Sequence, residues 1–180
     1  GTVVAARNPG SWANGLKVAI IDSFADQVIS VASTTGMTVG FGITQTASGV
    51  LPGAGTTSVL DGTFKGIITE IGTGTVTVKF LSHTPNGGTE IEKDYEASGV
   101  YKFGTSQIAV LNNSAVQTTT TTVSSTTDWF DSQTITTTNG VPISWNQIAE
   151  RPGTSAYAAA RSSRFDEVHV VVIDDDGDVT

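Results

Sequence analysis

The middle of the chain alternates apolar and polar residues with the period of two that is typical of β-strands. In the stretch TVTVKF, Val76, Val78 and Phe80 fall on one face, and two threonines and a lysine fall on the other. The stretch GIITEI precedes it, and the Gly-Thr-Gly of residues 72–74 between them is typical of a three-residue hairpin connection. These residues therefore predict two antiparallel strands joined by a tight turn.

Short strands of the same kind recur through residues 36–111, separated by turns that contain glycine. GVYKF (99–103) and SQIAVLN (106–112) predict two more strands, and SHTPNGGTE (82–90) predicts a loop before them. Short strands at this spacing are typical of a small barrel or sandwich. We therefore expect this segment to form a β module with its own core.

Nearer the two ends of the chain, two strands are apolar at consecutive positions rather than at alternate ones. LKVAII (16–21) follows the turn-rich stretch RNPGSWANG, and VHVVVI (168–173) follows a polar segment. Strands with this pattern are typically covered on both faces. We expect the two runs to pair in one sheet that is buried on both sides.

One segment in the last third of the chain predicts a helix. The Pro-Gly of residues 152–153 interrupts the preceding structure, and Ser155 or the threonine before it can cap a helix around Tyr157 to Arg161. Arg161 and Arg164 lie near its C-terminal end, where positive charge suits the helix dipole. We expect this helix to pack on the sheet formed by the two apolar strands.

These patterns together predict an α+β fold. Residues 1–28 and 129–180 are expected to form a discontinuous mixed α/β domain, and residues 29–128 an inserted all-β module. The threonine-rich run QTTTTTVSSTT (117–127) has little to bury, so it predicts a linker or a surface loop of that module. An exposed edge strand is the alternative, because threonine favours strands.

The stretch HVVVIDDDGDVT, residues 169–180, predicts a strand followed by a turn. Its Asp-Gly pair is a strong hairpin signal, so a second strand is expected after Thr180. On this basis the chain is expected to be a fragment, truncated at its C-terminus, of a longer protein. A calcium loop does not fit these residues, because Val172 would take the first ligand position and no glutamate follows.

Composition narrows the classes of function. The chain has 17 acidic and 9 basic residues, and its formal net charge of −8 argues against a nucleic-acid-binding surface. It has no cysteine, which excludes disulfides, thiol nucleophiles and thiolate metal sites. No apolar run approaches the ~20 residues of a membrane span, so no membrane insertion is expected.

The two histidines do not indicate a catalytic group. His83 lies in a polar stretch and is expected to be solvated, while His169 lies in an apolar strand, as expected of a satisfied core or interface histidine. No Ser-His-Asp arrangement can be inferred from the spacing. The glycine-rich stretches GMTVGFG (36–42) and GVLPGAG (49–55) lack the lysine and the following helix of a phosphate loop.

Two pairs of carboxylates are candidate sites. Asp128 and Asp131 in DWFD could serve as the paired acids of a glycosidase, but a surface turn with the two aromatic residues folded inward is favoured. Asp166 and Glu167 are expected to be a solvated charge pair. The sequence therefore predicts no catalytic, cofactor-binding or metal-binding residue, no cofactor and no enzymatic activity.

Three stretches resemble the contractile tail sheath proteins of T-even-like bacteriophages. AARNPGSWANGLKVAIID (5–22) resembles the family pattern Ala-Ala-(Arg/Lys)-x-Pro-Gly-x-x-Gly/Ala-Asn-x-(hydrophobic)-x-Val. Residues 143–180 are similar to a later part, in which Trp-x-x-Ile-Ala-x-Arg-Pro leads into a helix, a valine-rich strand and an acidic turn. DWFD (128–131) looks like the family's sequence just upstream. Together these stretches cover about a third of the chain, and their order is more specific than any one of them.

The resemblance implies a structural protein of the virion, assembled in the host cytoplasm. Sheath subunits polymerise around the tail tube and contract to drive it through the host envelope for genome delivery. The implied partners are other copies of the sheath subunit and the tail tube, with no direct contact to nucleic acid. In the family, terminal arms add strands to neighbouring subunits. Such arms are not identifiable here, so we expect this chain to be monomeric by itself.

A different class of function remains open for the β module. It could be a carbohydrate- or receptor-binding module of a phage or secreted protein, because Tyr95, Tyr101 and Phe103 lie near predicted loops. Those aromatic residues are better suited to the core of a small barrel, which is the favoured interpretation.

Overall fold

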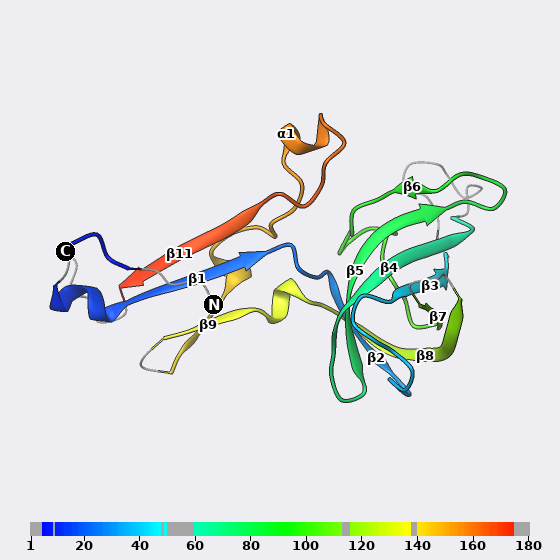
Figure 1. The fold of residues 1–180 in the computed structure, drawn as a ribbon, viewed down its shortest axis with the longest axis horizontal. Coiled ribbons are helices and arrows are strands. Elements are labelled where there is room, and N and C mark those ends of the chain that lie inside the picture. Colours follow the sequence, from blue (N-terminus) through cyan, green and yellow to red (C-terminus); the bar gives the residue numbers. More distant parts are fainter. Residues whose placement is uncertain are drawn as a thin grey trace. The chain divides into compact units, whose positions relative to one another are not determined.

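The computed structural model describes residues 5–8, 10–47, 49, 60–112, 116–137 and 140–174. They form two compact units, one of Phe24–Phe130 and one that joins Gly1–Ser23 to Asp131–Thr180 (Figure 1). The sequence had suggested boundaries after residues 28 and 128. The predicted hairpin turn around Gly177 and most of the stretch 49–55 lie outside the described residues.

The Phe24–Phe130 unit is a β-barrel. Its strands are β2 (Gln27–Val31), β3 (Gly42–Thr46), β4 (Thr63–Ile71), β5 (Thr75–Thr84), β6 (Ile91–Glu92), β7 (Gln107–Leu111) and β8 (Gln117–Asp128). Their order is β2-β8-β7-β3-β4-β5-β6, and a further pairing of β2 with β5 closes the first six into a ring. Of the two predicted architectures, barrel or sandwich, the structure therefore has the barrel.

Alternating side chains fill the interior of the barrel, as the sequence pattern predicts. Val76, Val78 and Phe80 on β5 are all 0% exposed, and they pack in one core cluster with residues from each of the other five ring strands. The predicted hairpin before them is confirmed: the Gly72 N–H donates to the Thr75 carbonyl at 2.9 Å. Gly74 has a φ of +70°, which favours glycine in this turn.

The threonine-rich run is neither a linker nor an edge strand, so both interpretations of residues 117–127 were wrong. It forms β8, whose first half pairs with β7 and whose second half pairs with β2. Val123 is 1% exposed and Thr121 is 7% exposed, while most other β8 side chains face solvent. A strand with so few inward apolar residues gives almost no hydrophobic pattern, although its threonines favour the extended backbone.

In the second unit, β1 (Leu16–Asp22) pairs antiparallel with β11 (Val168–Asp174) along its whole length. This confirms that the two apolar runs share a sheet. Among the described residues, however, the sheet has only these two strands, and the expected burial on both faces was wrong. Ile20 is 50% exposed and its partner Val170 is 59% exposed, whereas Ile21 on the opposite face is 6% exposed.

Smaller elements complete this unit. A 3-10 helix, η1, precedes β1, and a short hairpin pairs β9 with β10. Their bounds are η1 Ser11–Gly15, η3 Phe130–Ser132, β9 Thr134–Thr136, β10 Pro142–Ser144, η4 Trp145–Gln147 and α1 Ala156–Ala159. The Lys17 ammonium on β1 donates to the Thr136 carbonyl on β9 at 3.0 Å. This bond connects the two-stranded β1–β11 sheet, which we call the ribbon, to the β9–β10 hairpin.

The predicted α+β class was wrong, because the described chain is nearly all β. Its one α-helix, α1, covers a single turn where a helix around Ser155 to Arg161 was expected. The cap itself is confirmed, since Ser155 Oγ accepts from the Ala158 N–H at 3.1 Å. The helix stops where Ser162 and Phe165 take left-handed φ values of 53° and 60°. No helix in the described ranges is long and apolar enough to cross a membrane.

Candidate functional site

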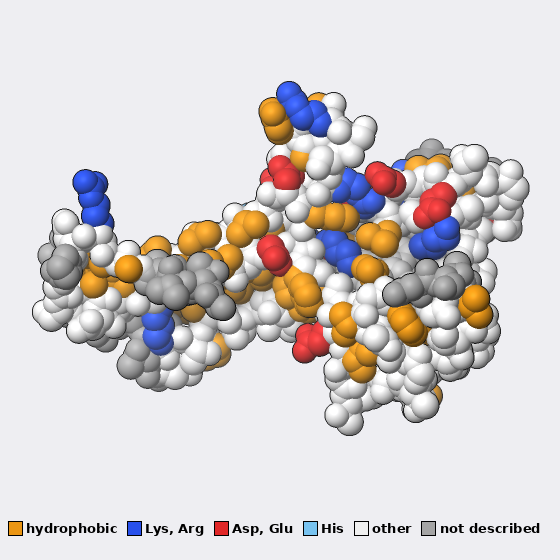
Figure 2. All heavy atoms as spheres, in the orientation of Figure 1, with side chains coloured by type: hydrophobic (Ala, Val, Ile, Leu, Met, Phe, Trp, Pro, Cys, Tyr) orange, Lys and Arg blue, Asp and Glu red, His pale blue; other side chains and the backbone are white. Residues whose placement is uncertain are grey.

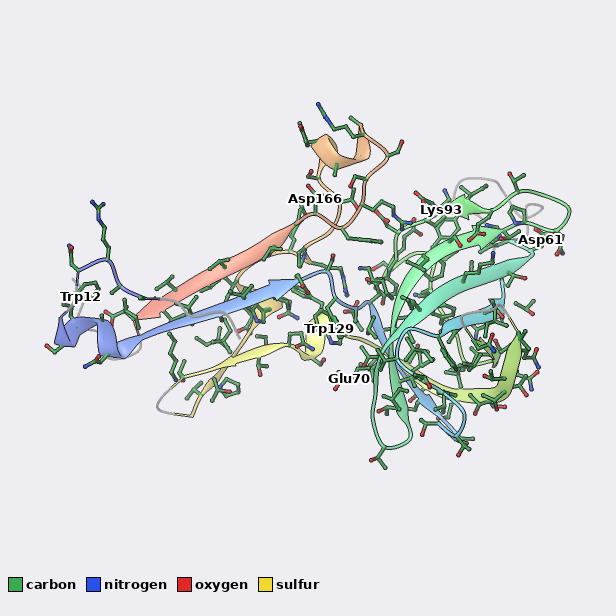
Figure 3. The ribbon with its side chains drawn as sticks, viewed as in Figure 1. Trp12, Asp61, Glu70, Lys93, Trp129 and Asp166 are labelled. Atoms are coloured by element: carbon green, nitrogen blue, oxygen red, sulfur yellow. The ribbon has the colours of Figure 1, made fainter. Side chains whose placement is uncertain are left out.

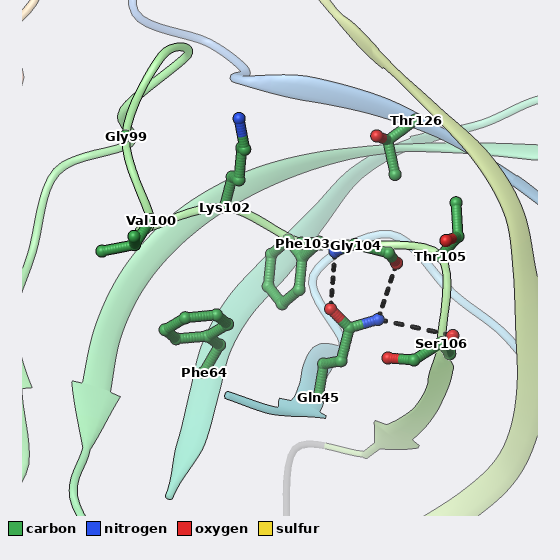
Figure 4. A pocket seen from close by; sticks show the side chains of 10 residues that line it. All are labelled: Gln45, Phe64, Gly99, Val100, Lys102, Phe103, Gly104, Thr105, Ser106 and Thr126. Carbon is green, nitrogen blue, oxygen red and sulfur yellow. Dashed lines mark hydrogen bonds between the residues drawn. The ribbon is translucent and has the colours of Figure 1, made fainter. Parts of the chain in front are cut away.

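Two buried glutamines fix the loop of residues 93–106 to the barrel. The Gln27 side chain on β2 accepts from the Phe103 N–H at 2.8 Å and donates to the Phe103 carbonyl at 3.0 Å. Gln45 on β3 accepts from the Gly104 N–H at 2.7 Å and donates to the Gly104 carbonyl at 2.9 Å (Figure 4). Each amide satisfies both backbone groups of one loop residue, as a neighbouring strand would. We call these two glutamines, with the backbone of Phe103 and Gly104, the glutamine clamp.

The clamp holds Phe103 inside the barrel. The Phe103 ring is 1% exposed and lies 5.3 Å from the Phe80 ring, while Tyr95 and Tyr101 pack against the core and remain partly exposed. The prediction that these aromatic residues belong to the barrel core is therefore confirmed for Phe103 and only partly correct for the two tyrosines. The predicted strand over GVYKF was wrong, because these residues form a loop, in which the backbone of Phe103 bonds to a side-chain amide.

A pocket of about 510 Å³ lies beside the clamped loop (Figure 4). Gln45 and Phe64 contribute from β3 and β4, Thr126 contributes from β8, and residues 99–100 and 102–106 contribute from the loop. This volume falls within the range of roughly 300–1,000 Å³ that is typical of small-molecule sites. The pocket belongs entirely to the barrel unit.

The described residues that line the pocket are mainly polar and include one cation and no acid. Thr105, Ser106 and Thr126 bring hydroxyl groups, and Lys102 brings an ammonium group. The Lys102 Nζ donates to the Ala97 carbonyl at 2.8 Å. Among the described lining residues there is no histidine or carboxylate, and the hydroxyl, amide and ammonium groups that are present can hydrogen-bond a ligand.

A buried ion pair is a second polar feature of the barrel. The Asp26 Oδ1 lies 3.0 Å from the Lys79 Nζ, and these side chains are 3% and 8% exposed. The Asp26 Oδ2 also accepts from the Phe80 N–H at 2.8 Å. The pair stabilises the junction between the start of β2 and the middle of β5, where removing either charge would leave the other buried.

The environment of His83 corrects an expectation. His83 is not a solvated loop residue, because it lies on β5, is 4% exposed and hydrogen-bonds through Nε2 to the Asp61 carbonyl. Its ring lies 5.6 Å from that of Phe64 and 5.9 Å from that of Tyr101. His83 is therefore part of the aromatic packing of the barrel and does not face the pocket lining.

An acidic group on the barrel surface has a shifted pKa. The Lys65 ammonium donates to Glu90 at 2.6 Å, and the Ser82 hydroxyl donates to the other carboxylate oxygen of Glu90. These two hydrogen bonds, the lysine's first, lower the pKa of Glu90 below its usual value of 4.5.

His169 on β11 is half-buried opposite Ile21. Its Nδ1 is buried and has no hydrogen-bond partner among the residues that the structure describes. The expectation of a satisfied histidine is therefore not met.

The carboxylates of DWFD have structural partners. The Asp128 Oδ2 accepts from the Tyr95 hydroxyl at 3.1 Å, and its Oδ1 accepts from the Phe130 N–H at 2.9 Å. The Asp131 Oδ1 accepts from the Asn146 side chain at 3.1 Å. Phe130 is 4% exposed, as expected for an inward-facing turn residue. Both carboxylates therefore hydrogen-bond to neighbouring groups of the protein and help to hold this turn in place.

Asp166 and Glu167 are not merely solvated charges. The Asp166 carboxylate accepts from the Ser155 N–H at 2.8 Å and from the Ser155 hydroxyl at 2.7 Å, and Figure 3 labels this residue beside α1. These bonds, the backbone bond first, lower the pKa of Asp166. Glu167 accepts from the Gly153 N–H at 2.8 Å. The two acids thus close the loop that carries α1.

Comparison with known proteins adds no relative. No family model, no curated protein and no solved structure matches this chain. Within the described ranges, no three His, Cys, Asp or Glu side chains gather where they could hold a metal ion.

Proposed function

We propose that this chain is a structural component of a contractile phage tail sheath, which polymerises around the tail tube and contracts to drive it through the host envelope. The observation that carries the proposal is the meeting of two distant motifs. Residues 5–22 and 143–180 both resemble sheath proteins, and they supply β1 and β11, which pair residue by residue from Leu16↔Asp174 to Asp22↔Val168. Two motifs that belong to one family are expected to be neighbours in its fold.

The surface of this ribbon supports a role in an assembly. One face carries five exposed apolar side chains, which we call the open face: Val18, Ile20, Val168, Val170 and Val172. Hydrophobic side chains lie along the ribbon in Figure 2. Contiguous apolar surface of this kind commonly marks a contact with another protein or segment.

The charge of the chain also bears on how copies could meet. With a formal net charge of −8, two copies repel each other at a distance, so their contacts must rely on apolar surface and main-chain hydrogen bonds more than on ion pairs. The open face supplies apolar surface, and the outer edges of the two-stranded β1–β11 sheet supply main-chain groups for such contacts.

Purified tails test the proposal. From a phage whose genome encodes this chain, intact contractile tails would be isolated and their proteins quantified by mass spectrometry, with the tube and capsid proteins as references. A sheath component should be present in about the same number of copies as the tube protein, because the sheath surrounds the tube along its length. Recovery of its peptides only with capsid, baseplate or fibre proteins would refute the proposal.

A further inference from the structure

We infer that the pocket beside the clamped loop binds a saccharide that carries a carboxylate. This activity goes beyond the proposed sheath function and does not depend on it. In the described part of the chain the pocket has three relevant properties: a preformed shape, hydroxyl groups without a hydrogen-bond partner and a single cation.

The pocket is held open before any ligand arrives. Gln45 is 4% exposed, and its amide bonds to Gly104 on both sides and to the Ser106 carbonyl at 3.4 Å. Gln27 fixes the adjacent Phe103 in the same way. Because the loop backbone is already ordered, a ligand binds without the entropic cost of ordering it.

The hydroxyl groups of the lining are available to a ligand. The Thr105, Ser106 and Thr126 hydroxyls have no hydrogen-bond partner in the parts of the chain that the structure describes. A hydroxyl can donate and accept at once, so three of them around one pocket match the alternating donors and acceptors of a sugar ring. The Val100 side chain adds an apolar patch for the C–H groups of such a ring.

The charge of the lining selects an acidic sugar over a neutral one. Lys102 has no carboxylate partner among the described residues, although acidic residues outnumber basic ones 17 to 9 in the chain. Glu96 lies on the same loop, but its Oε2 accepts from the Val100 N–H and it does not line the pocket. A phosphate would normally require several cations or a helix N-terminus, whereas a single lysine suits a carboxylate.

A titration of the ¹⁵N-labelled full chain followed by NMR tests the inference, with D-glucuronate, D-glucose and acetate compared at about 0.15 M ionic strength to screen the net charge. Glucuronate should shift the amide signals of Gly104, Thr105 and Ser106, with a dissociation constant on the order of 1–10 mM. Glucose, which lacks the charge, and acetate, which lacks the ring, should each bind at least about fivefold more weakly.

Two variants separate the pocket from general charge effects. Lys102→Gln should weaken glucuronate binding about tenfold and leave glucose binding unchanged, because it removes only the contact to the carboxylate. The matched variant Lys93→Gln removes the same charge from a lysine of the same loop that does not line the pocket, and should leave both affinities unchanged. Unshifted amides elsewhere confirm that each variant is folded.

Three results would overturn the inference. They are an absence of glucuronate-dependent shifts at residues 104–106, acetate binding as strong as glucuronate binding, and an equal loss of affinity in the two lysine variants. The first result would show that glucuronate does not bind at this pocket. The second would show that the sugar ring is not recognised. The third would show that binding depends on overall charge rather than on Lys102.

Discussion

Replacing the buried Gln27 with methionine should destabilise the barrel far more than the same replacement at an exposed strand position. Methionine has a similar length and volume, so packing is largely kept while both hydrogen bonds to Phe103 are lost. Phe103 is 1% exposed, so water cannot easily replace the lost partners of its N–H and carbonyl groups. An unsatisfied buried group costs about 1–3 kcal/mol, and the two together should lower the free energy of unfolding by about 2–5 kcal/mol.

The matched control is Gln107→Met. Gln107 lies on β7 and is exposed, so the same chemical change there should alter the stability of the barrel by less than about 0.5 kcal/mol. Comparing the two variants removes any effect that methionine has by itself.

Hydrogen exchange measured by mass spectrometry suits this comparison, because it reports each unit separately. The slowest amides of β5 report the global opening of the barrel, and those of β11 report the second unit. Gln27→Met should speed exchange in β5 by the factor that corresponds to about 2–5 kcal/mol and leave β11 unchanged. Equal exchange in the Gln27 and Gln107 variants would refute the claim that the clamp stabilises the barrel.

Three further outcomes follow from the structure. Asp26→Ala should destabilise the barrel by about 3–5 kcal/mol in urea unfolding, because it removes the carboxylate that lies 3.0 Å from the buried Lys79 ammonium and leaves that charge without this partner. Adding Lys79→Met to this variant should restore most of the lost stability, because it removes the buried charge. Glu90 has a lowered pKa in the folded state, so its stabilisation is present above pH 4.5 and is lost as the pH falls through the folded value. Glu90→Gln should therefore flatten the acid limb of a stability–pH curve, and an unchanged limb would assign it to other carboxylates. The chain alone should be monomeric by light scattering at micromolar concentration, because five open-face side chains are fewer than the 20–30 residues per partner typical of a stable interface, whereas a stable ring or filament would contradict this.

The sequence predicted the elements whose signal is local. Alternation at Val76, Val78 and Phe80 and the glycines of the 72–74 turn predicted the β4–β5 hairpin. The pairing of β1 with β11 joins distant residues, and it was predicted because the two runs share the same consecutive apolar pattern. The helix was overestimated because its signal is also local. Alanine-rich residues after a good cap favour a helix locally. The loop that carries α1 is instead closed by hydrogen bonds that Asp166 and Glu167, which lie beyond the helix in the sequence, accept from Ser155 and Gly153.

The candidate site could not be predicted, because its contacts join residues far apart in the chain. Gln27 and Phe103 are separated by 76 positions, and Gln45 and Gly104 by 59. A glutamine in a strand has no sequence signal that distinguishes a buried clamp from an exposed polar residue. The hydroxyls of Thr105 and Thr126 line one pocket only because the barrel brings β8 beside the loop.

Electron cryomicroscopy of extended and contracted tails, from a phage whose genome encodes this chain, tests the proposed function most directly. The barrel and the β1–β11 ribbon should fit as repeating units in the helical layer around the tube, and this layer should be shorter and wider after contraction. Density for these units in the capsid, baseplate or fibres, with none in the layer around the tube, would contradict it.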